Sequence, residues 1–125
     1  ADLNVPFSNI NEAEFLKELI ISNTAVTSLE GIQEATSLEQ FHLTDLNLSG
    51  PFPSELMQLV NLQGLFVNFN KFTGTIPTNI GGLTNLQQLY LYQNDLTGQI
   101  PTELGRLSAL RVLAMASNSF GGTLP

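Results

Sequence analysis

The sequence contains no cysteine, only one histidine, and only four lysine and arginine residues. The absence of cysteine excludes disulfides, thiolate metal sites and a cysteine nucleophile. Four cations cannot neutralise many phosphates, so the composition argues against nucleic-acid binding and against attraction to an anionic membrane surface. No apolar run approaches the roughly 20 residues of a membrane-spanning helix, so we expect no membrane insertion within this chain.

Acidic residues outnumber basic ones by eleven to four, and the formal net charge is −7. Most of the acids precede residue 46, and we interpret this as a solvated acidic end of the molecule. Hydrophobic residues make up 42% of the 125 residues, which is enough for one folded domain with its own core. The acids in that first part are Asp2, Glu12, Glu14, Glu18, Glu30, Glu34, Glu39 and Asp45.

An internal repeat is the most informative feature of the sequence. Three segments of 24 residues align without gaps, a fourth begins in the same register, and a unit of 22 residues precedes them. Such a period is typical of a solenoid, in which each coil buries its apolar side against its neighbours. We therefore expect residues 1–125 to form a single repeat domain that is part of a longer chain. Its expected units are a partial unit 1–12, repeats 13–34, 35–58, 59–82 and 83–106, and a partial repeat 107–125.

Each 24-residue repeat carries the same apolar and turn-forming positions. In the second repeat, Leu65 and Val67 alternate with outward residues, which predicts a short strand with one buried face. Asn70 follows, where its side chain can turn inward and bond backbone groups that a tight bend leaves unpaired. Gly74 permits a backbone conformation that other residues resist, and Pro77 fixes φ at the start of the return path. The equivalent asparagines form an expected ladder of Asn70, Asn94 and Asn118.

The segments LSGPFPSEL, FTGTIPTNIG and LTGQIPTELG resemble the plant-type leucine-rich repeat, and this resemblance covers residues 35–125. The unit 13–34, through its stretch NTAVTSLEGIQ, is similar to the 22-residue repeat of bacterial internalins. The resemblance implies an α/β leucine-rich repeat solenoid with a parallel β-sheet on its concave face and short 3₁₀ or loop segments on its convex face. Members of this family are overwhelmingly recognition modules, such as receptor ectodomains, enzyme inhibitors and adhesins.

The sequence departs from the family pattern in the asparagine ladder and at both ends. Leu46 occupies the ladder position of its repeat and Thr24 that of the preceding unit, so we expect the ladder to be interrupted there. The cysteine-bearing caps of secreted plant members are absent, and no polar terminal repeat follows the last coil. We therefore expect either that the chain is a piece of a longer protein or that a partner covers its ends.

The outward positions of the strands form the surface on which we expect a ligand to bind. Aromatic side chains gather on this surface in the middle repeats. Exposed aromatic clusters are costly unless a partner covers them, although stacked aromatics can also stabilise adjacent strands as cross-strand pairs. The central column of outward residues is Ile20, His42, Phe66, Tyr90 and Ala114. The candidate ligand-binding residues are His42, Thr44, Asp45, Phe66, Asn68, Phe69, Tyr90, Tyr92 and Gln93.

The sequence contains no recognisable catalytic or metal-binding constellation. The only histidine, His42, has Asp45 three residues further on, but two such ligands are too few for a stable metal site. There is no serine in a G-x-S-x-G turn and no phosphate-binding glycine loop, so we expect neither enzymatic activity nor a cofactor. Asn47 begins the single N-x-S/T sequon and is a candidate glycosylation site.

The sequence favours a non-enzymatic recognition module that binds a protein, peptide or glycan on its concave sheet. Two alternatives stay open: a structural module that stacks end to end or docks through uncapped solenoid ends, and an inhibitor of a secreted hydrolase. An ice-binding surface would need a flat array of small polar residues, which the aromatic columns oppose. The resemblance, together with a surface rich in serine, threonine and asparagine, favours an extracellular or cell-surface location.

Overall fold

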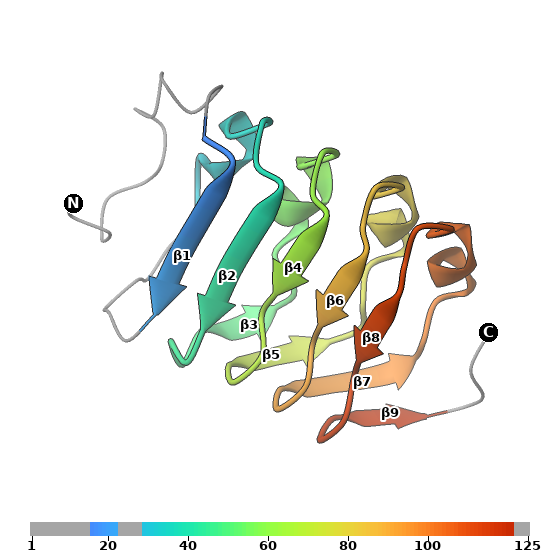
Figure 1. The fold of residues 1–125 in the computed structure, drawn as a ribbon. Helices are drawn as coiled ribbons and strands as arrows, with labels where there is room; N and C mark the ends of the chain where they lie inside the picture. The colour runs from blue at the N-terminus through green and yellow to red at the C-terminus, as the bar shows by residue number, and fades with distance from the viewer. Residues whose placement is uncertain (1–15, 23–28, 122–125) are drawn as a thin grey trace.

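Five short parallel strands, one from each successive coil, form the main sheet of a solenoid (Figure 1). The computed structural model describes residues 16–22 and 29–121. Each strand pairs with the equivalent strand of the next coil, so the sheet order follows the order of the repeats and confirms the predicted parallel-sheet solenoid. The strands are β1 (Glu18–Ser22), β2 (Gln40–Thr44), β4 (Gly64–Phe66), β6 (Gln88–Tyr90) and β8 (Val112–Ala114).

The strand register confirms the predicted columns of outward residues. Along the central column, Ile20 pairs with His42, His42 with Phe66, and Phe66 with Tyr90. Leu65, which precedes Phe66 in β4, points to the other side of the sheet and is fully buried. Because successive side chains alternate between the two faces, every outward residue lies beside its equivalents in the neighbouring coils.

A second parallel sheet, the side sheet, follows the bend after each main-sheet strand from β2 onward (Figure 1). The sequence analysis did not predict this sheet, although a signal exists in the alternation of buried Phe72 between exposed Lys71 and Thr73. Gly74 has a φ of 75°, and an added Cβ would meet no atom within 4 Å, so glycine is required for its backbone conformation and not for space. The strands are β3 (Ser49–Pro51), β5 (Lys71–Gly74), β7 (Asp95–Gln99) and β9 (Ser119–Gly121).

Short 3₁₀ helices form the return path of the coils, as the resemblance implied. In each 24-residue repeat the helix begins directly after a proline; Pro77, for example, has a φ of −68° and an extended backbone. Ile80, inside the helix that follows Pro77, is fully buried. The proline therefore turns the chain so that one residue of the helix reaches the core. The helices are η3 (Ile32–Glu34), η4 (Ser54–Gln58), η5 (Thr78–Gly82) and η6 (Thr102–Arg106).

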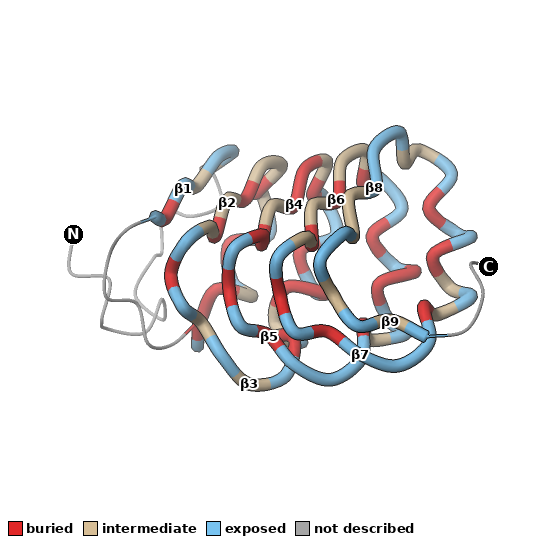
Figure 2. The backbone as a smooth tube through the Cα atoms, turned by 90° about the horizontal axis from the view of Figure 1, so that it is seen from below, coloured by how far each residue is buried: buried red, intermediate tan, exposed pale blue. Residues whose placement is uncertain are grey.

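The apolar positions of successive coils meet in one continuous core. Figure 2 shows that buried residues recur along each coil, with exposed residues between them. The predicted core residues of the third repeat, Leu86, Leu89 and Leu91, have no exposed surface. The last described coil differs, because Leu113 is 37% exposed although it is the equivalent of Leu89. In this coil, a position that is fully buried in the preceding coils is therefore partly accessible to solvent.

Buried asparagines bond each coil to the one before it. The Oδ1 of Asn70 accepts hydrogen bonds from the backbone N–H groups of Leu46 and Leu48, at 3.2 Å each. Its Nδ2 donates to the carbonyl oxygens of Leu43 at 2.7 Å and Val67 at 3.0 Å. A single side chain therefore satisfies backbone groups of two coils, as the sequence predicted. Equivalent bonds are made by Asn94 and Asn118.

The leucine at the ladder position of the first 24-residue repeat, Leu46, is buried, and its own N–H is bonded to Asn70. Since each ladder asparagine bonds backbone groups of its own coil and of the preceding coil, a leucine at this position removes both sets of bonds. In its own coil, Asn70 still bonds the N–H of Leu46 and the carbonyl of Leu43, so the loss concerns mainly the preceding turn. That turn falls in residues 23–28, which include Thr24 and lie outside the described residues, as does the expected partial unit 1–12. The expected interruption of the ladder there therefore stays a prediction.

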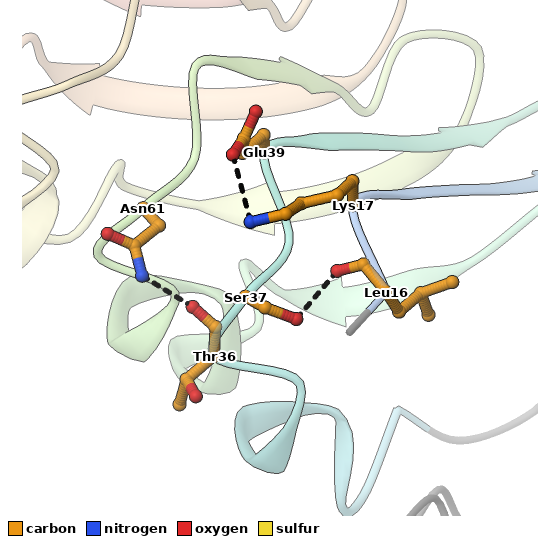
Figure 3. A network of polar contacts seen from close by, with 6 residues as sticks. All are labelled: Leu16, Lys17, Thr36, Ser37, Glu39 and Asn61. Carbon is orange, nitrogen blue, oxygen red and sulfur yellow. Dashed lines mark hydrogen bonds and ion pairs between the residues drawn. The ribbon is translucent and has the colours of Figure 1, made fainter. Parts of the chain in front are cut away.

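A second set of polar bonds links the coils at the start of the main-sheet strands, and the sequence analysis missed it. Figure 3 shows Ser37 Oγ donating to the carbonyl of Leu16 at 2.7 Å and Asn61 Nδ2 donating to the carbonyl of Thr36 at 2.7 Å. Asn85, 24 residues after Asn61, donates in the same way to a carbonyl one coil back, at 3.3 Å. These amides are exposed, so water competes for the same carbonyls and each bond contributes little.

We predict that the two sets of inter-coil bonds differ in their effect on stability. Asn94→Ala removes the acceptor of the Phe72 N–H and the donor to Val67, and should lower the free energy of unfolding by about 3 kcal/mol because buried groups lose their partners. Asn85→Ala, at an exposed amide, should lower it by less than about 1 kcal/mol. Urea denaturation followed by circular dichroism measures both values, and equal losses would contradict this assignment.

Candidate functional site

The predicted site residues lie on the outward surface of the main sheet, on β2, β4, β6 and the turns that follow them. They form three neighbouring rows, because each row takes one position from each coil. The first row holds His42, Phe66 and Tyr90; the second holds Thr44, Asn68 and Tyr92; the third holds Asp45, Phe69 and Gln93.

Aromatic rings run continuously along the first row. The imidazole of His42 lies parallel to the ring of Phe66, with centroids 4.2 Å apart and an angle of 7° between the planes. Phe66 in turn meets Tyr90 edge to face, at 4.8 Å and 78°. Both geometries are favourable for aromatic pairs. The row therefore presents one connected aromatic strip across three strands.

Two more aromatic residues extend this strip away from the first row. Tyr90 lies 6.2 Å from Tyr92 between ring centroids, and Tyr92 meets Phe69 edge to face at 5.2 Å. Phe69 is 47% exposed, whereas Tyr90 and Tyr92 are half-buried. Together the five rings form a surface that we call the aromatic patch: His42, Phe66, Phe69, Tyr90 and Tyr92.

The third row has an unusual backbone conformation. Asp45, Phe69, Gln93 and Ser117 all have φ between 58° and 60°, in the left-handed region that non-glycine residues rarely adopt. This conformation costs a non-glycine residue about 1–2 kcal/mol, with asparagine and aspartate tolerating it best. Since aspartate, glutamine and serine occupy the same position in other coils, the turn itself does not require an aromatic residue.

Asn68, at the centre of the second row, differs from the sequence-based expectation. The alternation predicted an outward polar side chain, but only 7% of Asn68 is exposed, whereas its row neighbour Thr44 is half-buried. Its Oδ1 is buried and has no hydrogen-bond partner, the one such side-chain atom among the described residues. Phe66 and Phe69 lie on either side of it along the chain, and rings of this size can cover a short amide.

Gly64 contributes to the patch although the sequence analysis assigned it no role. It lies two residues before Phe66 on the same face of β4 and beside Gln40 of β2. A Cβ at this position would meet the Gln40 Oε1 and would lie 2.8 Å from Cε2 of Phe66. The missing side chain therefore leaves the space into which the Phe66 ring and the Gln40 amide fold.

The charged residues within the strands and turns that form the patch surface are acidic. Glu18 Oε2 lies 3.5 Å from His42 Nε2, and Asp45 is exposed at the end of the third row. Lys17 lies just outside the patch and is paired with Glu39 at 3.3 Å. No lysine or arginine occurs in the described segments that form this surface, 18–22, 40–45, 64–69, 88–93 and 112–117. The patch thus offers aromatic faces and acceptors of hydrogen bonds, with negative charge nearby.

Two further predictions from the sequence concern metal binding and glycosylation. Among the described residues, no cluster of three or more histidine, aspartate or glutamate side chains could hold a metal ion. Asn47, the first residue of the sequon, is exposed in a turn with a φ of 56°. Its side chain is therefore accessible, and its glycosylation stays a prediction.

Comparison with known proteins identifies the architecture. Residues 60–120 match the family model for the leucine rich repeat. A chain of the BIR3–SERK2 complex from Arabidopsis thaliana has 36% sequence identity and a TM-score of 0.80, over 86% of this chain and 58% of that chain. The chain has the leucine-rich repeat solenoid fold and is similar to plant-type members of that family.

Two further structures that are similar to this chain differ in what they bind. The LRR ectodomain of the plant membrane receptor kinase GASSHO1/SCHENGEN3 from Arabidopsis thaliana, in complex with CASPARIAN STRIP INTEGRITY FACTOR 2, has 36% identity and a TM-score of 0.81, over 87% of this chain and 13% of that chain. A plant ice-binding protein has 31% identity and a TM-score of 0.77, over 85% of this chain and 35% of that chain.

The chain spans 58% or less of the length of these three structures. No curated protein sequence matches it. In the part of the chain that the structure describes, no helix is both long and apolar enough to cross a membrane.

We predict that Gly64→Ala moves the Phe66 ring without unfolding the solenoid. The added Cβ displaces two flexible side-chain ends, so the free energy of unfolding should change by less than about 1 kcal/mol, while the stack with His42 opens. The measurement is the ring-current shift of the His42 imidazole protons by NMR. Gly82→Ala is the matched control, since nothing lies within 4 Å of its added Cβ; an unchanged His42 signal in Gly64→Ala would contradict the prediction.

Proposed function

We propose that the protein is a non-enzymatic recognition module that binds a protein or peptide ligand on the aromatic patch. The observation that carries this proposal is Phe69, an aromatic residue that is 47% exposed and is held in a left-handed backbone conformation. Both features lower the stability of the free protein, because the conformation is strained and the ring stays in contact with water. The same turn occurs in the equivalent coils, so the feature that points to a function is the exposed aromatic residue placed in it and not the turn itself.

A purely structural role explains Phe69 less well. Its contact with Tyr92 is worth about 0.5–1.5 kcal/mol as an aromatic pair, which is about the same as the strain it must offset. The equivalent residues Asp45, Gln93 and Ser117 hold the same turn without any ring. A partner that covers the ring gives the aromatic residue a net benefit, and aromatic residues are enriched in such interfaces.

The related structures support a protein or peptide as the ligand and an extracellular or cell-surface location. The receptor kinase HAESA was solved in complex with the peptide hormone IDA and the co-receptor SERK1, and its structure has 30% identity to this chain with a TM-score of 0.80. A secreted hydrolase is one possible protein ligand within this proposal. A glycan is the second chemical candidate, because exposed aromatic faces also offer flat apolar surfaces to a sugar ring.

We predict that Phe69→Asn separates stability from binding. Asparagine tolerates the left-handed conformation, so the free energy of unfolding should stay the same or rise by up to about 1 kcal/mol. Peptides selected on the whole chain from a displayed random library should bind this variant, and Tyr90→Ala, at least about tenfold more weakly. Urea denaturation and biolayer interferometry give the two values.

The matched control for this experiment is Val60→Ala, which removes an exposed apolar side chain that is 50% accessible and lies outside the patch. It should leave peptide affinity unchanged. If Phe69→Asn and Tyr90→Ala bind the selected peptides as the unchanged protein does, the patch is not the binding surface. If Phe69→Asn instead lowers the free energy of unfolding by more than about 1 kcal/mol, the rings serve mainly to stabilise adjacent strands.

A second candidate function, assembly through the last described coil, has one specific observation in its favour. Leu113 is 37% exposed at a position where Leu65 and Leu89 are fully buried, and among the described strands β8 pairs on one side only. Another copy could add a coil there, since unpaired strands and exposed apolar residues favour association.

We predict from this second candidate that the protein self-associates as its concentration rises. Light scattering after size-exclusion chromatography, over a wide range of concentration, measures the mass. Leu113→Asp should abolish any association because it places a charge on the contact surface. A mass that stays monomeric at the highest concentration would contradict the assembly function and leave the recognition function unaffected.

A further inference from the structure

We propose that the aromatic patch receives a guanidinium group, so that its ligand is a protein or peptide segment that presents an arginine side chain. This inference rests on the proposed recognition function and specifies the chemistry of its ligand. Four features of the described residues lead to it: an acceptor without a donor, a carboxylate on the adjoining coil, exposed aromatic rings, and the absence of lysine and arginine from the segments that form the surface.

The acceptor is Oδ1 of Asn68, which is buried and has no hydrogen-bond partner. Leaving such a group unpaired costs about 1–3 kcal/mol, and natural structures rarely retain one without a reason. The terminal amide torsion of asparagine is broad, so a small rotation or a movement of the exposed Phe69 ring can bring this oxygen to an incoming donor. A ligand that supplies an N–H group would pair this oxygen, and removing the cost of the unpaired acceptor would add to its affinity.

The carboxylate is that of Asp45, one coil before Phe69. The two residues have almost the same φ, 59° and 60°, at equivalent positions, so their side chains leave the backbone in similar directions. The two residues lie three positions after the paired residues His42 and Phe66, and neighbouring parallel strands are about 4.8 Å apart, so we expect the exposed carboxylate near the Phe69 ring. A planar cation over the ring would then have this carboxylate on one side and, once the amide rotates or the ring moves, the Asn68 oxygen on the other.

The aromatic rings supply the third feature. Phe69 is the most exposed ring of the patch, and Tyr92 meets it edge to face. A cation over an aromatic face gains about 0.5–2 kcal/mol, and a guanidinium also stacks on the ring as a plane. Lysine lacks this planarity, and its ammonium group is more strongly hydrated, so it would gain less from the same surface.

The fourth feature is charge. The segments that form this surface contain no lysine or arginine, and the acids near it are Glu18 and Asp45. The whole chain has a net charge of −7, which attracts a cationic partner and repels an anionic one during encounter. The Asp45 carboxylate, the buried Asn68 oxygen and the aromatic faces accept hydrogen bonds or attract cations, while guanidinium has five donors and no acceptor. The two sets of groups are complementary.

The test compares three peptides on the full chain by isothermal titration calorimetry and NMR: hexa-arginine, hexa-citrulline and hexa-lysine. Citrulline has nearly the shape of arginine without its charge, and lysine has the charge without the planar group. Hexa-arginine should bind at least about fivefold more tightly than hexa-lysine and shift the Phe69, Tyr92 and Asn68 signals, while hexa-citrulline should show no measurable binding.

Variants at the two polar groups locate the contact. Asp45→Asn and Asn68→Leu should each weaken hexa-arginine binding at least about threefold, and Asn68→Leu should keep or raise the free energy of unfolding because an unpaired acceptor is removed. Asp95→Asn is the matched control: it removes the same charge from the exposed side sheet and should change affinity by less than about twofold. If Asn68→Leu does not fold, Asp45→Asn alone decides the contact.

Equal binding of hexa-arginine and hexa-lysine, or an equal loss in Asp45→Asn and Asp95→Asn, would overturn the arginine assignment in favour of general charge attraction. Absence of hexa-arginine binding would overturn it as well. The proposed recognition function is tested by a separate outcome. If the library peptides lose affinity in Tyr90→Ala but are not enriched in arginine, the patch binds ligands and only the guanidinium inference is wrong.

Discussion

Parallel pairing between equivalent residues of successive coils is the constraint on which the rest of this structure depends. It places every strand residue beside the residue one repeat away, as in the pairing of His42 with Phe66 and Phe66 with Tyr90. The buried asparagines maintain this spacing at the bend, because each bonds backbone groups of its own coil and of the one before. Surface rows, core rows and turn rows all follow from this one register.

The same scaffold can therefore carry unrelated surfaces. Substituting an outward residue changes a row without disturbing the core, which explains how similar solenoids occur in a receptor ectodomain and in a plant ice-binding protein. In this protein the rows carry five aromatic or imidazole rings, an unpaired amide oxygen and a strained Phe69. The left-handed turn recurs in every described coil from β2 onward, so the solenoid needs the turn but not an aromatic residue in it. The unpaired amide oxygen and the row of rings are likewise absent from the equivalent positions of other coils, which is why we propose that this surface binds a ligand.

Much of the fold was predictable because the signal was repeated. The strand positions, the columns on the main sheet and the inward asparagines were predicted from the repeat and are confirmed, and the 3₁₀ return path, which the family resemblance implied, is present as well. The side sheet was missed, since its strands have only three to five residues and a single buried position such as Phe72 gives little alternation to detect. The exposure of Leu113 was likewise not predicted, because the repeat pattern assigns every equivalent leucine to the core.

For the candidate site, the sequence predicted which residues share one face but not their geometry, and their role in binding stays a prediction. By itself the sequence determined which residues share the outward face, because strand alternation and the 24-residue period decide this locally. Only the tertiary structure decided that Asn68 is buried with its oxygen unpaired, that Phe66 folds over Gly64, and that Phe69 is held in a left-handed conformation. The physical reason is that burial and stacking depend on how side chains pack in space, both within one coil and between coils that lie about one repeat apart in the sequence, while the left-handed turn follows from the backbone path of each coil.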